Sequence, residues 1–146
     1  MKRSDVCELI QTNLPIAQRL GLFVQEVSET GLKVHLPFDR QLLNHTGTVH
    51  ASAQFAAAET AALAAGLLFL NGLTVTCTSK SCELRFRKPA QGDLWASAQL
   101  ASSELSEIQQ RLVSESKVDV QVLVEVVDAH AERVAEGTVT LALRRL

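Results

Sequence analysis

One carboxylate stands alone in a long run of small and apolar residues. In the segment NHTGTVHASAQFAAAETAALAAGLLFL, residues 44–70, the only acidic residue is Glu59. Its neighbours three and four positions away on a helix are Phe55, Ala56, Ala62 and Leu63. An ionised carboxylate is rarely left unpaired among apolar side chains. Glu59 is therefore a candidate general base or nucleophile, and the alternative is a glutamate paired across a subunit contact.

Polar side chains before Glu59 are candidates for the same reaction. His50 lies nine residues earlier, which would place it on the opposite face of a shared helix, so we expect it at the helix start, either touching a substrate or orienting the loop. Ser52 lies seven residues earlier, almost two turns, and shares a face with Glu59, although a serine there also serves as a cap. Asn44 either fixes a water or carbonyl group or makes an ordinary turn before Gly47.

A long helix is needed to hold these residues. Residues 49–70 predict a helix of roughly 33 Å at 1.5 Å per residue, apolar on nearly every face. The run without a charge or amide, residues 61–70, is about half of the roughly 20 residues that span a bilayer. We therefore predict a buried helix, covered by the rest of the chain, and no membrane anchor.

Alternating apolar and polar residues predict the strands that cover this helix. Residues 21–38 alternate around SETG, which is typical of a hairpin. Four later segments also alternate with period two: residues 73–89, 92–101, 117–128 and 133–146. In the third of these, one face carries Val118, Val120, Val122, Val124 and Val126. Residues 102–116 predict a short helix or excursion, and residues 1–20 a further helix, kinked or divided at Pro15.

This order of elements predicts an α+β fold, an antiparallel sheet of about six strands wrapped around one long central helix. With 146 residues and 47% hydrophobic content, the chain has the size of a single domain, residues 1–146, with one core. No internal repeat or interdomain linker is visible.

Composition narrows the possible partners. A net charge of -2 gives no whole-protein attraction to nucleic acid or to an anionic membrane, so we expect neither as a partner. The three cysteines, Cys7, Cys77 and Cys82, lack paired C-x-x-C spacing, and no secretory signal precedes them. We expect reduced thiols in a cytoplasmic protein and no metal site. Because Cys77 and Cys82 are five residues apart on a strand, alternation places them on opposite faces.

The segment NHTGTVHASAQFAAAET, residues 44–60, resembles the signature of hotdog-fold acyl-CoA thioesterases of the phenylacetate-degradation type. In that signature an Asn and then Gly-Thr-x-His precede a helix that bears an Asp or Glu, and Asn44, Gly47, His50 and Glu59 match in order and spacing. FRKPAQGD, residues 86–93, is similar to the family's strand-end Pro-Ala and Gly-Asp turn. The resemblance implies the hotdog fold, a homodimer or dimer of dimers, an active site at the dimer interface, acyl-CoA as substrate, and no cofactor.

The resemblance also implies roles for single residues. Glu59 activates water or attacks the thioester carbonyl, while the amide after the motif histidine, here Ala51, binds the thioester oxygen. Family members usually have Gly-Gly where this chain has Ala51 and Ser52. Ser79 occupies the position where similar thioesterases place a hydroxyl facing the partner's carboxylate. A basic strand end could meet the phosphates of coenzyme A or be merely solvated; it consists of Arg85, Arg87 and Lys88.

Two other functions compete with thioester hydrolysis. Hotdog dehydratases and hydratases pair a histidine with an acidic residue, and His45 lies fourteen residues before Glu59, a similar spacing, but the proline-rich surroundings of that pair are absent. A non-catalytic acyl-binding module is the third possibility. The missing Gly-Gly favours it, because a site can bind a ligand without the geometry that stabilises an oxyanion, and fold alone does not decide function.

Overall fold

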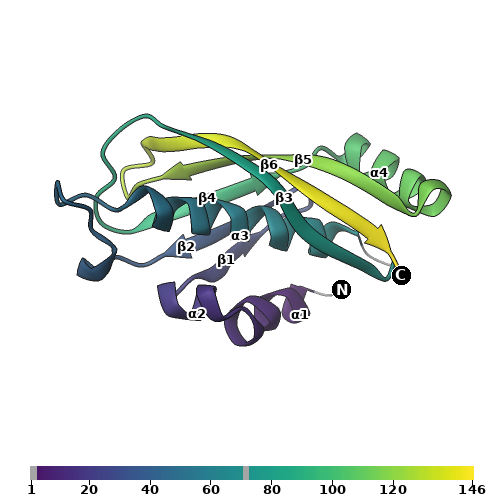
Figure 1. The fold of residues 1–146 in the computed structure, drawn as a ribbon, viewed down its shortest axis with the longest axis horizontal. Helices are drawn as coiled ribbons and strands as arrows, with labels where there is room; N and C mark the ends of the chain where they lie inside the picture. Colours follow the sequence, from purple (N-terminus) through teal and green to yellow (C-terminus); the bar gives the residue numbers. More distant parts are fainter. Residues whose placement is uncertain (1–2, 71–72) are drawn as a thin grey trace.

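A computed structural model of the protein describes residues 3–70 and 73–146. The elements and their bounds, shown in Figure 1, are α1 (Arg3–Glu8), the π-helical turn η1 (Leu9–Asn13), α2 (Pro15–Leu20), β1 (Phe23–Val27), β2 (Gly31–Leu36), the short 3-10 turn η2 (Arg40–Leu42), α3 (Ala51–Phe69), β3 (Val75–Phe86), β4 (Leu94–Gln99), α4 (Ser102–Glu115), β5 (Lys117–Val127) and β6 (Arg133–Arg145). The predicted hairpin, central helix, later strands and intervening short helix all form, and the N-terminal helical segment is divided before Pro15 as expected.

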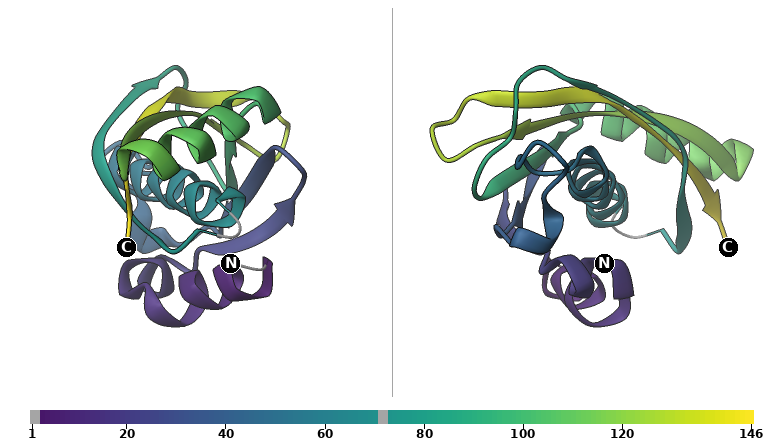
Figure 2. Two further views of the ribbon diagram at one scale, coloured as in Figure 1. Left: turned by 90° about the vertical axis from the view of Figure 1, so that its right-hand side faces the viewer. Right: turned by 60° about the vertical axis from the view of Figure 1, so that its left-hand side comes forward.

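Six antiparallel strands form one sheet in the order β1-β2-β4-β5-β6-β3. The sheet curls over α3, and the right-hand view of Figure 2 shows the helix enclosed on its upper side and flanks. This is the predicted arrangement of an antiparallel sheet around a single long helix. Strands β1 and β3 are the two edges of the sheet.

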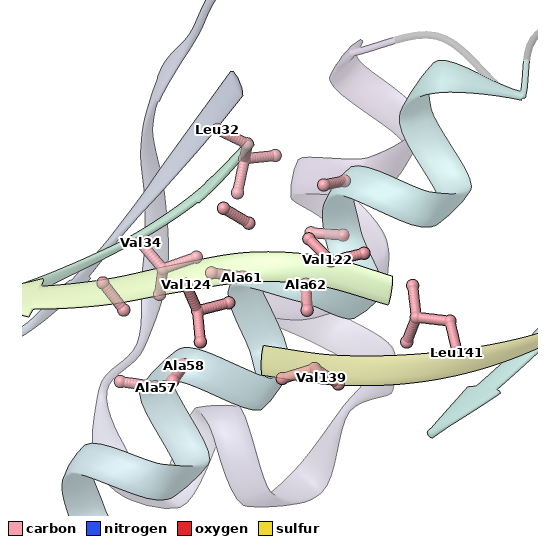
Figure 3. Close-up of a cluster of buried hydrophobic side chains, with 14 of the residues drawn as sticks. Leu32, Val34, Ala57, Ala58, Ala61, Ala62, Val122, Val124, Val139 and Leu141 are labelled. Atoms are coloured by element: carbon pink, nitrogen blue, oxygen red, sulfur yellow. The ribbon is translucent and has the colours of Figure 1, made fainter. Parts of the chain in front are cut away.

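The core lies between α3 and the inner face of the sheet. Alanines on α3 meet valines and leucines from the strands, as the close-up in Figure 3 shows for Ala57, Ala61, Val122 and Leu141. All five valines of β5 that the alternation placed on one face are buried. By length and composition α3 could cross a membrane, but it is the core helix of this sheet, as predicted.

The sheet wraps α3 but does not cover every side of it. Helices α1 and α2 lie on the side away from the sheet (Figures 1 and 2), and α2 packs against α3. A stripe at helical spacing therefore stays partly accessible; it consists of Ser52, Phe55, Ala56, Glu59 and Leu63. We call it the open face of α3.

Strand β3 contains a bulge that changes which side chains share a face. Ser79 pairs with Leu141 and Ser81 with Thr140, so Lys80 is an extra residue on β3. The alternation is shifted by one residue there, and Cys77 and Cys82 both point inward and pack against the core. The prediction that these cysteines lie on opposite faces was wrong, because simple alternation assumes a strand without an inserted residue.

Candidate functional site

Glu59 lies on the open face of α3, half-buried, and is held by a side chain from the neighbouring strand. The hydroxyl of Ser79 donates a hydrogen bond to Glu59 Oε1. Both residues line a pocket of about 440 Å³, which we call the Glu59 pocket. Its other lining residues are mostly apolar or small: Ile16, Phe55, Ala56, Thr60, Lys80, Ser81 and Cys82.

The contact between Ser79 and Glu59 forms within one chain. The family resemblance implied a hydroxyl facing the partner's carboxylate, but β3 packs against α3 of the same chain and brings the two together directly. Ser79 faces inward because it pairs with the inward-pointing Leu141 immediately before the bulge. Lys80, the inserted residue, forms an ion pair with Asp119 on β5. Lys80 therefore lines the Glu59 pocket with its cation paired to a carboxylate of β5.

His50 is the N-cap of α3, as its spacing from Glu59 predicted. Its Nδ1 accepts the amide hydrogen of Ser52 at 3.0 Å and therefore carries no hydrogen, so the Ser52 hydroxyl, at 2.8 Å, also donates to it. The ring then keeps its hydrogen on Nε2. Both residues are exposed and line a second pocket of about 320 Å³, the His50 pocket. Ser52 lies on the open face with Glu59, as predicted.

Asn44 organises the loop that leads into α3. Its Oδ1 accepts hydrogen bonds from the Thr46 amide at 3.0 Å and the Thr48 amide at 3.1 Å, and its Nδ2 donates to Thr48 Oγ1 at 2.9 Å. Gly47 has a φ of +78°, a conformation that favours glycine. The side chain of Asn44 thus performs the turn role proposed as its alternative, and one Nδ2 hydrogen remains for a ligand.

Ala51 begins α3 with an ordinary backbone conformation. Neither Ala51 nor Ser52 has a positive φ, so the absence of the family's Gly-Gly causes no backbone strain. The first amides of a helix have no partner within it, which leaves the Ala51 N–H suited to a carbonyl oxygen. Ala51 lines a pocket of about 690 Å³, the Ala51 pocket, together with Asn44, Gln54 and Arg87. Gln54 is 4% exposed and donates from Nε2 to the Val49 carbonyl at 3.1 Å, which fixes the chain before His50.

Of the two predicted arginines, Arg87 reaches a pocket beside α3 and Arg85 does not. Both line a pocket on the outer face of the sheet, where Arg85 forms an ion pair with Glu83 at 3.8 Å, and neither lines the Glu59 pocket. Arg87 lines the Ala51 pocket and donates to Glu136 Oε1 at 2.7 and 3.0 Å. Its hydrogen bonds hold the pKa of Glu136 below its usual range. Arg87, but not Arg85, is therefore placed next to the Ala51 end of α3.

The two inward-pointing cysteines are poor nucleophiles in this setting. Burial, and then the charge of Glu59, raises the pKa of Cys77 from 9.0 to about 12 and that of Cys82 to about 11. Because their pKa values are raised, both thiols stay protonated at neutral pH. The thiolate is the reactive form of cysteine, so neither is a good nucleophile here. Glu59 is the only acidic residue lining its pocket, so it is the group there with the charge needed for base or nucleophilic chemistry.

Two further observations concern histidine and possible metal ligands. His45 is exposed in the loop before α3 and does not line the Glu59 pocket. Within residues 3–70 and 73–146, no group of three His, Cys, Asp or Glu side chains is arranged to hold a metal ion.

Sequence reasoning missed the contribution of Ile16 to the Glu59 pocket. Ile16 is 52% exposed on α2, and no local pattern shows against which element a short N-terminal helix docks.

Solved structures resemble this chain over nearly its full length. Protein PA5026 from Pseudomonas aeruginosa, described as a probable thioesterase, is 25% identical with a TM-score of 0.83, over 100% of this chain and 97% of that one. Thioesterase HI1161 from Haemophilus influenzae is 17% identical with a TM-score of 0.78, over 100% and 92%. The E. coli PaaI protein from the phenylacetic acid degradation operon is 20% identical with a TM-score of 0.71, over 98% and 92%.

The neighbours share the hotdog fold, and the predicted fold class is confirmed: the chain has the hotdog fold. Of the three, HI1161 is named a thioesterase and PA5026 a probable thioesterase. The chain belongs to the family described as "Domain of unknown function (DUF4442)", whose sequence model matches residues 4–143. No curated protein matches the sequence significantly.

Proposed function

We propose that this protein is an acyl-CoA thioesterase in which Glu59 is the general base or nucleophile. The observation that carries the proposal is a single carboxylate on the open face of the core helix, oriented by the Ser79 hydroxyl and bordered by an apolar pocket. A thioester needs an activated nucleophile at its carbonyl carbon and an apolar space for its acyl group. The Glu59 pocket offers both.

The chemistry follows from the charge of Glu59. Acting as a base, the carboxylate takes a proton from a water whose oxygen adds to the carbonyl carbon; the C–S bond then breaks, and the proton goes to the departing thiolate. Acting as a nucleophile, it adds to the carbonyl carbon, the C–S bond breaks and coenzyme A leaves as a thiolate that takes up a proton, and water then hydrolyses the resulting mixed anhydride. In both routes the carbonyl oxygen becomes negative, and a free amide at a helix start, such as that of Ala51, stabilises this charge.

We further propose that two chains share each active site in a homodimer, or in a dimer of dimers. Within one chain, Ala51 and Glu59 line different pockets and lie eight residues apart on α3. A two-fold axis beside α3 would bring the Ala51 end of one helix to Glu59 of the other. Edge strand β3 has twelve residues, and pairing it with a second copy would satisfy its open edge. A monodisperse, active monomer at micromolar concentration would overturn this arrangement.

An acyl-CoA panel with a free-thiol reagent tests the function. Thiol release that is lost in Glu59→Gln, with an unchanged fold by circular dichroism, supports hydrolysis at this site. Binding without thiol release in the parent protein would instead identify a non-catalytic module, and hydration of an enoyl chain would identify the dehydratase class. A fully active Glu59→Gln variant would reject Glu59 as the catalytic group.

Mixing two inactive variants tests the shared site. Because Ser79 and Glu59 act in the same chain, the complementary defects have to be Glu59→Gln in one chain and a blocked helix start, Ala51→Trp, in the other. A mixed dimer contains one intact site, so activity should partly return after subunit exchange. No recovery after exchange has been verified by mass spectrometry would count against a site built from two chains.

We also propose that the enzyme works without a cofactor, on a small-molecule acyl-CoA, in the cytoplasm. The support is chemical: Glu59 supplies the reactive group, and all three cysteines are unpaired thiols. Dialysis against a chelator should leave the thioesterase activity unchanged.

A further inference from the structure

The Glu59 pocket and the His50 pocket meet at two side chains. Among the residues that the structure describes, Ile16 from α2 and Ala56 from α3 are the two that line both pockets. The two pockets therefore follow one another along the open face of α3. From Glu59 to Ser52 the helix advances seven residues, about 10 Å at 1.5 Å per residue.

The His50 pocket has the lining expected of a chamber for an aliphatic chain. Its wall consists largely of aliphatic or small side chains: Ile16, Leu20, Leu42, Leu43, Ala53 and Ala56. Polar groups are confined to three residues, Gln41, His50 and Ser52, all of which are exposed. Dispersion and burial of apolar surface are thus the main interactions that this wall offers a ligand.

Ile16 is held in place by a short, well-anchored helix. Pro15 occupies the first position of α2, where its fixed φ suits a helix, and Gly21 ends the helix with a φ of +66° and an amide bonded to the Ala17 and Gln18 carbonyls. Ala17 is fully buried, which fixes the helix against the core. Ile16 nonetheless stays 52% exposed, and it lines both pockets together with the small Ala56. Where the two pockets meet, the space therefore depends on the size of both side chains.

We propose that Ile16 and Ala56 form a passage that selects the substrate by the length of its acyl chain, and that the His50 pocket holds the far end of an extended aliphatic acyl group. This inference rests on the proposed function. The thioester carbonyl lies at Glu59, and the chain runs over Ala56 toward Ser52 for about two helical turns. Short acyl groups fill only the Glu59 pocket and gain nothing from the second one.

The test changes the width of the passage and measures a ratio. Ile16→Trp narrows it and Ile16→Ala widens it; the control is Val113, a 55% exposed apolar residue on α4 that lines neither pocket, changed to Trp and to Ala. For each protein kcat/KM is measured with acetyl-, hexanoyl- and dodecanoyl-CoA. Ile16→Trp should lower the dodecanoyl-to-acetyl ratio roughly tenfold or more, the scale of a few methylene contacts. Ile16→Ala should raise the ratio, and both Val113 variants should leave it unchanged.

The outcomes separate this inference from the proposed function. Suppose that the parent hydrolyses acyl-CoA while neither Ile16 variant changes the ratio, although both variants unfold cooperatively on heating. That result overturns the proposed passage and leaves the thioesterase assignment standing. If the parent hydrolyses none of the panel, the assignment fails, and the passage is tested by calorimetric binding of dodecyl-CoA and ethyl-CoA thioethers. Tighter binding of the dodecyl thioether that Ile16→Trp abolishes supports the chamber, and equal binding of the two thioethers overturns it.

Discussion

Removing the hydroxyl of Ser79 should weaken catalysis, and the whole effect should come from the loss of its hydrogen bond to Glu59. The hydroxyl donates to one carboxylate oxygen, and a hydrogen bond to a charged group contributes about 1.5–3 kcal/mol net. Ser79 is exposed, so water can replace part of that bond, and we take the lower end of the range. A loss of about 1.4 kcal/mol in transition-state stabilisation corresponds to a tenfold fall in kcat/KM. Ser79→Ala should therefore retain about a tenth of the parent's kcat/KM.

A double-mutant cycle shows whether Ser79 acts by positioning Glu59. Glu59→Gln removes the charge and should lower kcat by about 10²–10⁴-fold. Adding Ser79→Ala to Glu59→Gln should then cost almost nothing further, because the bond that it removes no longer serves a charged base or nucleophile. Ser79→Thr keeps a hydroxyl on the same face of β3 and should restore most of the activity. The matched control is Thr78→Ala, since Thr78 is an exposed neighbour on the same strand that does not line the Glu59 pocket.

Hydrolysis of acyl-CoA, followed with a free-thiol reagent, is measured for the parent and all five variants at saturating and at low substrate. Two results would refute the reasoning: Ser79→Ala with the parent's kcat/KM, or a double variant whose loss equals the product of the two single losses. The first would mean that the hydrogen bond contributes nothing to the reaction. The second would mean that Ser79 contributes independently of Glu59.

Three further predictions concern stability. Burial raises the pKa of Cys77 from 9.0 to about 12, so in that pH range the native state binds more protons than the unfolded chain and stability falls as pH rises; thermal melts of Cys77→Ser between pH 8 and 11 should show a shallower decline than the parent. Hydrogen bonds from the Phe38 amide and His35 lower the pKa of Asp93. Its contribution to the stability of the fold is therefore present at neutral pH and lost as pH falls below about 4. Asp93→Asn should lower the Tm at pH 7, and the difference in Tm between parent and variant should shrink at pH 3. A Cβ on Gly137 would lie 1.8 Å from the Glu83 carbonyl oxygen, so Gly137→Ala should cost about 3 kcal/mol or more in urea unfolding, and an unchanged midpoint would contradict that close approach.

Periodicity predicted the elements because each of them is decided largely by its own residues. The five alternating valines of β5 are buried on one face, and the alanine-rich run forms α3 within two residues of its expected start. His50 was placed at the helix start from its spacing to Glu59, and it is the N-cap. These predictions hold because strand alternation and helical spacing are local properties of the backbone.

The errors concern relations between distant segments. The bulge at Lys80 arises where β3 pairs with β6, Arg133–Arg145. Nothing in the sequence relates this distant strand to Cys77 or Cys82. A one-residue insertion moves every side chain beyond it to the other face, so both cysteines point to the inner face of the sheet. Likewise, a basic strand end cannot show which of its cations faces the site. Arg85 and Arg87 both line the pocket on the outer face, and Arg87 also lines the Ala51 pocket.

The position of Glu59 in a nearly uncharged helix follows from where the sheet stops. Facing the sheet, α3 presents alanines, whose small size lets the strands approach closely; a Cβ at Gly66 would already lie 2.7 Å from Leu141 Cδ1. A carboxylate on that side would be buried without a partner, which is costly. On the open face the same helix carries Glu59 between Phe55 and Leu63, where apolar side chains border it but Ser79 and solvent reach it. The composition of α3 thus combines two surfaces, a tightly packed one that fixes the helix and a partly accessible one that is suited to chemistry.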